Sequence, residues 1–113
     1  MRNWSLLSQA ISALQQQGLP CVIATVVATK GSTPQKVGWK LIVSPQGRVA
    51  GTIGGGRVEA KIIEDALTLF HNVLAPTLKE YHLTQELGMC CGGTMTVYLE
   101  TMVAQERLWI FGA

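Results

Sequence analysis

One run of residues, positions 21–29, constrains the fold more than any other feature of this sequence. Its letters, CVIATVVAT, are mostly β-branched and show no alternation of apolar with polar residues. That pattern predicts a central strand buried on both faces, which needs a covering layer on each side. Apolar residues recur at helical spacing in residues 4–17 and 57–70, so these two segments are predicted to be the covering helices.

Further strands are predicted around this central one. Residues 39–44 and 47–52 are expected to be two strands, joined by the link Ser44-Pro45-Gln46-Gly47, in which the proline and the glycine suit a hairpin turn. Residues 78–83 and 94–102 are also expected to be strands, the second because apolar and polar residues alternate along it. The fold class expected is therefore α+β: a single domain with a mixed β-sheet packed by two main helices.

Composition excludes some classes of function and suggests that the chain has a neighbour. Charged residues make up only 14% of the 113-residue chain, against roughly 25% in a typical soluble domain. A chain with so little polar surface is expected to have a neighbour, either another domain or a second copy in a homodimer. A net charge of +2 is too weak for a nucleic-acid-binding surface, and no apolar run approaches the roughly 18 residues that a membrane span needs.

Glycines gather in three loops, at residues 30–38, 51–56 and 88–93. Such clusters indicate unusual backbone angles or a close approach of the backbone to something else, and we expect the three loops to converge at one edge of the sheet. Gly54, Gly55 and Gly56 lead into the second helix, and Arg57 lies in its first turn. Exposed N–H groups there could bind an anion, or the glycines could simply form a tight connection.

The first loop allows two interpretations as well. Lys30, Ser32, Thr33 and Lys36 could bind an anionic ligand, or they could form a solvated turn around Pro34. The second interpretation requires nothing beyond the ordinary turn chemistry of proline and serine.

The cysteines also leave two interpretations open. Cys90 and Cys91 are followed by two glycines, so either thiolate could be an accessible ligand for a soft metal, or both could be small residues in a tight turn. A third, Cys21, begins the buried run. An odd number of cysteines, two of them adjacent, favours free thiols and a reducing cytoplasm. His71 and His82 are isolated and are interpreted as structural.

Three blocks together resemble a known family in their order and spacing. They are Lys30-Gly31-Ser32-Thr33-Pro34 with Val37, Gly38 and Lys40, then Gly51-Thr52-Ile53-Gly54-Gly55-Gly56 with Glu59, and finally Cys91-Gly92-Gly93. These blocks resemble the N-terminal domain of the XdhC/CoxI family, accessory proteins of molybdenum hydroxylases such as xanthine dehydrogenase. The doubled cysteine is most similar to the xanthine dehydrogenase branch.

The resemblance implies a chaperone rather than an enzyme. Family members bind molybdenum cofactor (a molybdopterin) as cargo, protect it while its sulfido ligand is installed, and deliver it to an apo-hydroxylase; the implied partners are apo-xanthine dehydrogenase, or a related hydroxylase, and a cysteine desulfurase. The implied cofactor-binding residues are Gly31, Ser32, Thr33, Gly54, Gly55, Gly56, Arg57, Cys90, Cys91, Gly92 and Gly93. Cys91 is the implied contact to the metal. Arg57 stands where many relatives carry cysteine or histidine, and a guanidinium there suits a phosphate.

The same resemblance implies how the chain is divided. Residues 1–106 are expected to form the N-terminal domain, and residues 107–113 the first strand of a Rossmann-like second domain that is cut short. Two other functions remain open from the residues themselves: a cysteine-dependent sulfur-transfer enzyme, and an interaction module that recruits partners without a ligand of its own.

Overall fold

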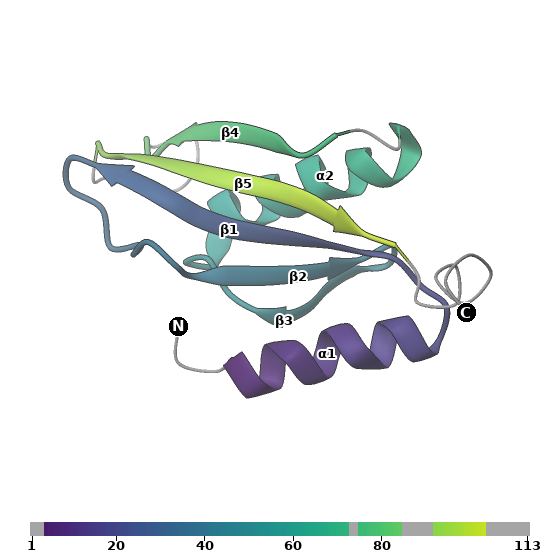
Figure 1. Ribbon diagram of the computed structural model, residues 1–113. Coiled ribbons are helices and arrows are strands. Elements are labelled where there is room, and N and C mark those ends of the chain that lie inside the picture. Colours follow the sequence, from purple (N-terminus) through teal and green to yellow (C-terminus); the bar gives the residue numbers. More distant parts are fainter. Residues whose placement is uncertain (1–3, 73–74, 85–91, 104–113) are drawn as a thin grey trace.

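The computed structural model describes residues 4–72, 75–84 and 92–103, and the fold is drawn in Figure 1. The elements are α1 (Trp4–Gln16), β1 (Cys21–Lys30), β2 (Lys40–Ser44), β3 (Gly47–Gly51), α2 (Gly56–Asn72), β4 (Thr77–His82) and β5 (Thr94–Met102). Both predicted helices and all five predicted strands are present, with ends within two residues of those expected. Neither helix is long and apolar enough, within these described ranges, to cross a membrane.

The α+β class and the two covering helices are confirmed, but the sheet differs in one respect from the expected one. The strand order is β3-β2-β1-β5-β4, and all four pairs of neighbours are antiparallel instead of mixed. The physical reason lies in the connections. A parallel pair needs a crossover between neighbouring strands, whereas the crossover helix α2 here joins the two edge strands, β3 and β4, which do not pair.

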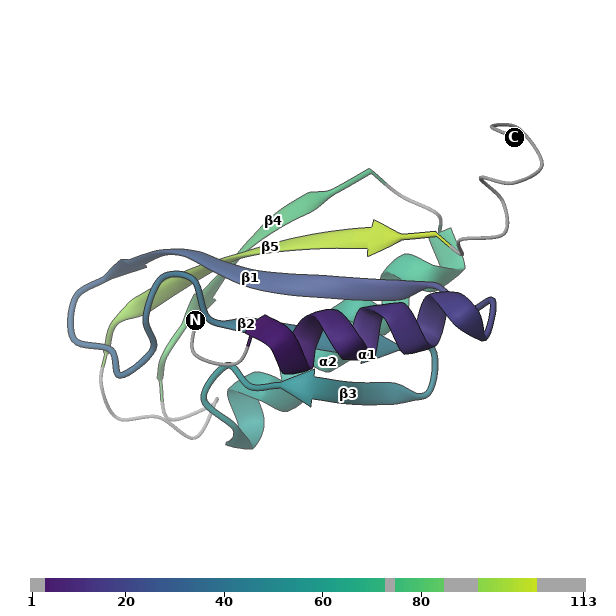
Figure 2. The same ribbon diagram turned by 60° about the horizontal axis from the view of Figure 1, so that its bottom comes forward.

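The two helices pack on opposite faces of the sheet, as Figures 1 and 2 show. Alternate residues of β1 point to the two faces, with Val22, Ala24 and Val26 in the larger core with α2, and Cys21 and Ile23 in the smaller core with α1. This arrangement confirms that the run beginning at position 21 forms a central strand with both faces covered.

The covering does not extend along the whole of β1. From Val27 to Lys30 the strand is exposed, although the unbroken apolar run predicted burial as far as residue 29. The pairing with β2 ends at Thr25, opposite Lys40, and the register with β5 shifts between Val26 and Ala28. Beyond this bulge β5 is the only described strand that pairs with β1, and the side chains of β1 are exposed within the described structure.

The strands are aligned so that one end of the sheet carries all three glycine-rich loops. Strands β1, β3 and β4 end there, and β2 and β5 begin there, because Lys30 pairs with Thr94, and Leu41 with Gly51. We call this the glycine-loop end; it comprises residues 31–39, 52–55 and 92–93 and lies at the left in Figure 1. The expected convergence of the three loops is therefore present for the described residues.

Candidate functional site

The backbone of the first loop lies directly against the beginning of β5. A Cβ added to Gly93 would overlap the carbonyl oxygen of Ser32 and lie 2.9 Å from that of Lys30, and one added to Gly31 would lie 3.4 Å from the Cα of Gly93. Gly93 is buried, and its carbonyl accepts a 2.8 Å hydrogen bond from the Leu83 N–H. Glycine is needed at 93 because two backbone segments meet there without space for a side chain.

A side chain joins the first loop to the second. The Thr33 hydroxyl donates a 2.6 Å hydrogen bond to Oε1 of Gln35 and accepts one of 3.2 Å from the Gln35 N–H. This arrangement directs Nε2 of Gln35 at Gly54, where a Cβ would overlap it. Among the predicted site residues, the structure therefore groups Gly31, Ser32 and Thr33 with Gly93 on one side and with Gly54 on the other.

Gln35 is the polar residue that the sequence did not single out. It is only 3% exposed, and its Nε2 has no hydrogen-bond partner among the described residues. An unpaired buried donor costs about 1–3 kcal/mol, so this amide is an unfavourable element of the described loop. No sequence signal identifies Gln35, because a buried glutamine and an exposed glutamine in a polar loop look the same in the sequence.

The turn before α2 is organised by one carboxylate from the helix itself. Oε1 of Glu59 accepts hydrogen bonds from the Thr52 hydroxyl at 2.6 Å, the Ile53 N–H at 3.0 Å and the Gly55 N–H at 3.2 Å. Nε of Arg48 lies 3.3 Å from Oε2 of Glu59 and donates to the Gly51 carbonyl at 3.0 Å. A single buried side chain thus fixes the turn from the end of β3 to the start of α2.

These contacts determine the charge of Glu59. Burial by itself raises the pKa of this carboxyl, but the hydrogen bonds from Thr52, Ile53 and Gly55 and the charge of Arg48 lower it more, so the pKa lies below its ordinary value. Glu59 is therefore ionised near neutral pH. Its carboxylate accepts hydrogen bonds from the N–H groups of Ile53 and Gly55. These two donors are therefore not free to bind an anionic ligand, as the sequence had suggested they could.

A different part of the turn remains for a ligand. Gly56, Arg57 and Val58 begin α2, and N–H groups in the first turn of a helix have no carbonyl partner within it. Gly55 and Gly56 have φ angles of +70° and +63°, and a Cβ at either would meet nothing within 4 Å. Arg57 is exposed beside them. Backbone donors and a guanidinium are the groups that hold an oxyanion.

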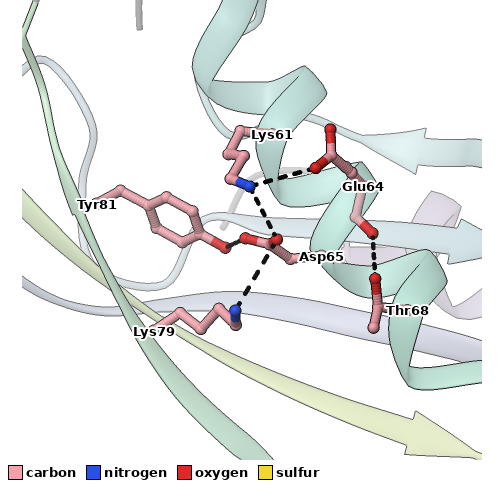
Figure 3. A network of polar contacts seen from close by, with 6 residues as sticks. All are labelled: Lys61, Glu64, Asp65, Thr68, Lys79 and Tyr81. Atoms are coloured by element: carbon pink, nitrogen blue, oxygen red, sulfur yellow. Dashed lines mark hydrogen bonds and ion pairs between the residues drawn. The ribbon is translucent and has the colours of Figure 1, made fainter. Parts of the chain in front are cut away.

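Helix α2 is held to the edge strand β4 by a polar cluster, drawn in Figure 3. The Tyr81 hydroxyl donates a 2.6 Å hydrogen bond to Oδ2 of Asp65, and the ammonium groups of Lys61 and Lys79 lie 3.4 and 3.9 Å from Oδ1. Burial, the hydrogen bond to Asp65 and its charge raise the pKa of Tyr81 far above its ordinary value. The hydroxyl therefore stays protonated and donates at every ordinary pH.

The described cysteine and the two histidines do not form a site in the structure. Cys21 is 1% exposed, and burial raises the pKa of its thiol, so it is an unreactive core residue. His71 and His82 are exposed, and no three metal-ligating side chains come together within the described residues. Cys90 and Cys91 lie outside the described residues, and their proposed role as ligands stays a prediction.

Known proteins share this sequence pattern. The family model for the XdhC and CoxI family matches residues 14–81. The chain is 34% identical over 108 residues to YqeB of Escherichia coli K12, covering 88% of this chain and 19% of YqeB. It is 27% identical over 103 residues to a Bacillus subtilis 168 protein described as a probable subunit of xanthine dehydrogenase, covering 86% of this chain and 31% of that protein.

A solved structure shares the fold. A crystal structure described as a xanthine dehydrogenase from Bacillus halodurans superposes with a TM-score of 0.71 at 26% sequence identity, over 90% of this chain and 32% of that one. The chain thus spans a third or less of the length of the relatives that it matches. Because the family model covers more than half of the sequence, and covers both the first loop and the turn before α2, the chain belongs to the XdhC and CoxI family.

Proposed function

We propose that this chain binds molybdenum cofactor as cargo, protects it during sulfuration, and passes it to a molybdenum hydroxylase related to xanthine dehydrogenase. The relatives support the link to such enzymes, since two of them are named as a xanthine dehydrogenase or as part of one. The observation that carries the proposal is the convergence of the described parts of three glycine-rich loops at one end of the sheet. The role is that of an accessory protein acting in the cytoplasm, without catalysis of its own.

The chemistry of the glycine-loop end suits such a cargo. The cofactor is a pterin with an anionic phosphate and a dithiolene that holds the molybdenum. The first-turn N–H groups of α2 and the exposed guanidinium of Arg57 suit the phosphate. The thiolate of Cys91, a soft ligand, is the proposed contact to the metal. Gly92, just before β5, is exposed with open space around it.

Release is the second requirement of a carrier. Cargo that is held by a few hydrogen bonds to backbone groups and one thiolate dissociates more readily than a metal enclosed by a full set of protein ligands. We propose that an apo-hydroxylase accepts the cargo and that a cysteine desulfurase supplies the sulfur.

Co-purification tests the proposal. The chain is purified anaerobically after incubation with molybdenum cofactor, and the protein peak is assayed for molybdenum and for pterin fluorescence after oxidation. We expect both to elute with the chain in equal amounts. Elution of neither would contradict cofactor binding by this chain and would favour an interaction module. Accumulation of a persulfide on a cysteine without bound pterin would favour sulfur transfer instead.

A further inference from the structure

A cavity of about 850 Å³ opens between α1 and the β2–β3 hairpin at the glycine-loop end. Its lining includes Leu6, Ala10, Trp39, Lys40, Gly51 and Thr52. This volume lies within the range of pockets that hold small molecules, roughly 300–1,000 Å³, and such pockets are typically apolar with a few polar groups. The walls from α1 are mostly apolar, and the polar groups lie where the strands meet the loops.

Lys40 is the cation of this cavity, and it has no counter-ion among the described residues. It is half-buried, and its Nζ donates a 3.0 Å hydrogen bond to the neutral hydroxyl of Thr25. Elsewhere Lys61 and Lys79 are paired with Asp65, and Arg48 with Glu59. Within the ranges that the structure describes, no carboxylate forms an ion pair with Lys40, although burial of a charge is unfavourable without a partner.

The neighbouring residues give the cavity a fixed shape. The N–H of Val26 donates to the Trp39 carbonyl at 2.9 Å, and the N–H of Trp39 donates to the Lys36 carbonyl at 3.2 Å. These bonds hold the backbone of Trp39 just before β2. The Trp39 side chain packs against the larger core on the α2 face of the sheet, so Trp39 forms a fixed edge of the cavity.

The cavity is continuous with the turn that precedes α2. Gly51 and Thr52 line it, and the Thr52 hydroxyl is the one that donates to Glu59. A Cβ on Gly51 would overlap the Lys40 carbonyl and lie 3.0 Å from Cδ2 of Leu7, so glycine at this position brings β3 close to both Lys40 and α1. A ligand in the cavity therefore lies beside the loop that the proposed function assigns to cargo.

We propose that this cavity binds a planar aromatic anion, with the ring against the apolar wall of α1 and the negative group on Nζ of Lys40. The assignment rests on the proposed function in one respect: a pterin with an anionic substituent belongs to this class of ligand. It adds a second cation, on the α1 face of the sheet, to the groups expected to hold the cargo.

Fluorescence titration of the full chain with pterin-6-carboxylate tests this assignment. The parent is expected to bind it saturably, and Lys40→Met to raise its Kd at least about fivefold, because a charge-assisted hydrogen bond is lost. Lys40→Arg keeps the charge and is expected to retain binding. Lys79→Met, which changes an exposed lysine of β4, is the matched control and is expected to leave the Kd unchanged. Thermal unfolding of each variant shows that it is folded.

Two further arms locate the ligand. Uncharged 6-methylpterin is expected to bind the parent and Lys40→Met equally, because it lacks the anionic group. Ala10→Phe places a ring in the cavity and is expected to abolish binding of both pterins. Equal affinity of Lys40→Met and the parent for pterin-6-carboxylate, or full binding by a folded Ala10→Phe, would overturn the assignment.

The experiments distinguish failure of the proposed cofactor carriage from failure of the proposed cavity site. A chain that retains molybdenum but does not bind pterin-6-carboxylate saturably leaves the proposed function in place and removes the cavity as a ring-binding site. A chain that binds pterin-6-carboxylate through Lys40 but retains no molybdenum supports the cavity as an anion site and contradicts cofactor carriage.

Discussion

Glu59 is the residue on which the geometry of the turn before α2 depends. Its carboxylate accepts three hydrogen bonds from the turn and faces Arg48. The sequence indicated a glycine turn at the start of a helix, and that interpretation is confirmed. It could not indicate which acceptor binds the first N–H groups, because a side chain four to seven residues away must fold back onto the turn to reach them.

Glu59→Gln is expected to lower the free energy of unfolding by about 1–3 kcal/mol at neutral pH, since charge-assisted hydrogen bonds become neutral ones. The folded-state pKa of Glu59 lies below its ordinary value of 4.5. Its stabilising effect is therefore complete above pH 4.5 and is lost as the pH falls through the lower, folded-state pKa. Urea unfolding measured against pH is expected to show the parent and variant converging in acid; a constant difference would contradict this role.

Cys91→Ser tests the proposed metal contact. Serine keeps the size of the side chain and removes the soft, polarizable thiolate, so co-purified molybdenum is expected to fall sharply while the thermal unfolding temperature changes little. Cys21→Ser is the control: it places a hydroxyl in the core, where Cys21 is 1% exposed, and is expected to lower stability without a specific loss of metal. Equal molybdenum in the Cys91 variant and the parent would exclude the thiolate contact.

At the scale of elements, periodicity predicted each helix and strand, but it did not predict how the strands pair. The sheet expected from the sequence is mixed, and the structure corrects this to four antiparallel pairs. Strand order depends on pairs far apart in sequence, such as Lys30 with Thr94, and no local pattern encodes them. The convergence of the glycine loops follows from that register.

Tyr81→Phe is expected to loosen the attachment of α2 to β4. The variant keeps the ring but removes a hydrogen bond to a carboxylate that is mostly buried, and such bonds contribute about 1.5–3 kcal/mol. Lys79→Met is the comparison, because its ion pair at 3.9 Å is substantially exposed and is expected to contribute under about 1 kcal/mol. Urea unfolding of the two variants in parallel shows which one loses more unfolding free energy. An equal or larger loss in Lys79→Met than in Tyr81→Phe would contradict this account.

Gly93→Ala and Gly92→Ala separate steric contact from backbone strain. Gly92 has a φ of +73° with open space around an added Cβ, so alanine is expected to cost about 1–2 kcal/mol from strain alone. At Gly93 the Cβ would overlap the Ser32 carbonyl oxygen, and alanine is expected to cost about 3 kcal/mol, as overpacking does. Chemical denaturation measures both. A smaller effect at 93 than at 92 would show that the loops are not closely packed.

At the scale of the whole molecule, the low charge fraction predicted a chain that needs a neighbour. Large apolar side chains remain exposed on both the α1 and β4 sides, including Trp4 at 53% and Leu78 at 63%. The homodimer stays a prediction. So does the division of the chain at residue 106, since residues 107–113, with Trp109, lie outside the described residues. The relatives extend well beyond the length of this chain.

The site itself was predictable only in part. The glycine pattern grouped the three loops into one candidate site, and the structure brings the described ones together. The glycine pattern did not identify Gln35 or Lys40 as parts of a site. The unpaired amide of Gln35 and the unpaired charge of Lys40 depend on burial and on which partners lie nearby in the described fold. Glycine motifs indicate where the backbone adopts unusual dihedral angles. Whether a polar side chain is buried and paired depends on the residues that the fold brings next to it.

Hydrogen–deuterium exchange of the chain, measured with and without molybdenum cofactor under anaerobic conditions, tests the central claim most directly. The claim is that cargo binds at the glycine-loop end. We expect the cofactor to slow exchange in residues 31–39 and 52–58, and to leave the opposite end of the sheet unchanged, where α1 ends at Gln16 and β1 begins at Cys21. Bound cofactor that protects only the opposite end, or neither loop, would contradict it.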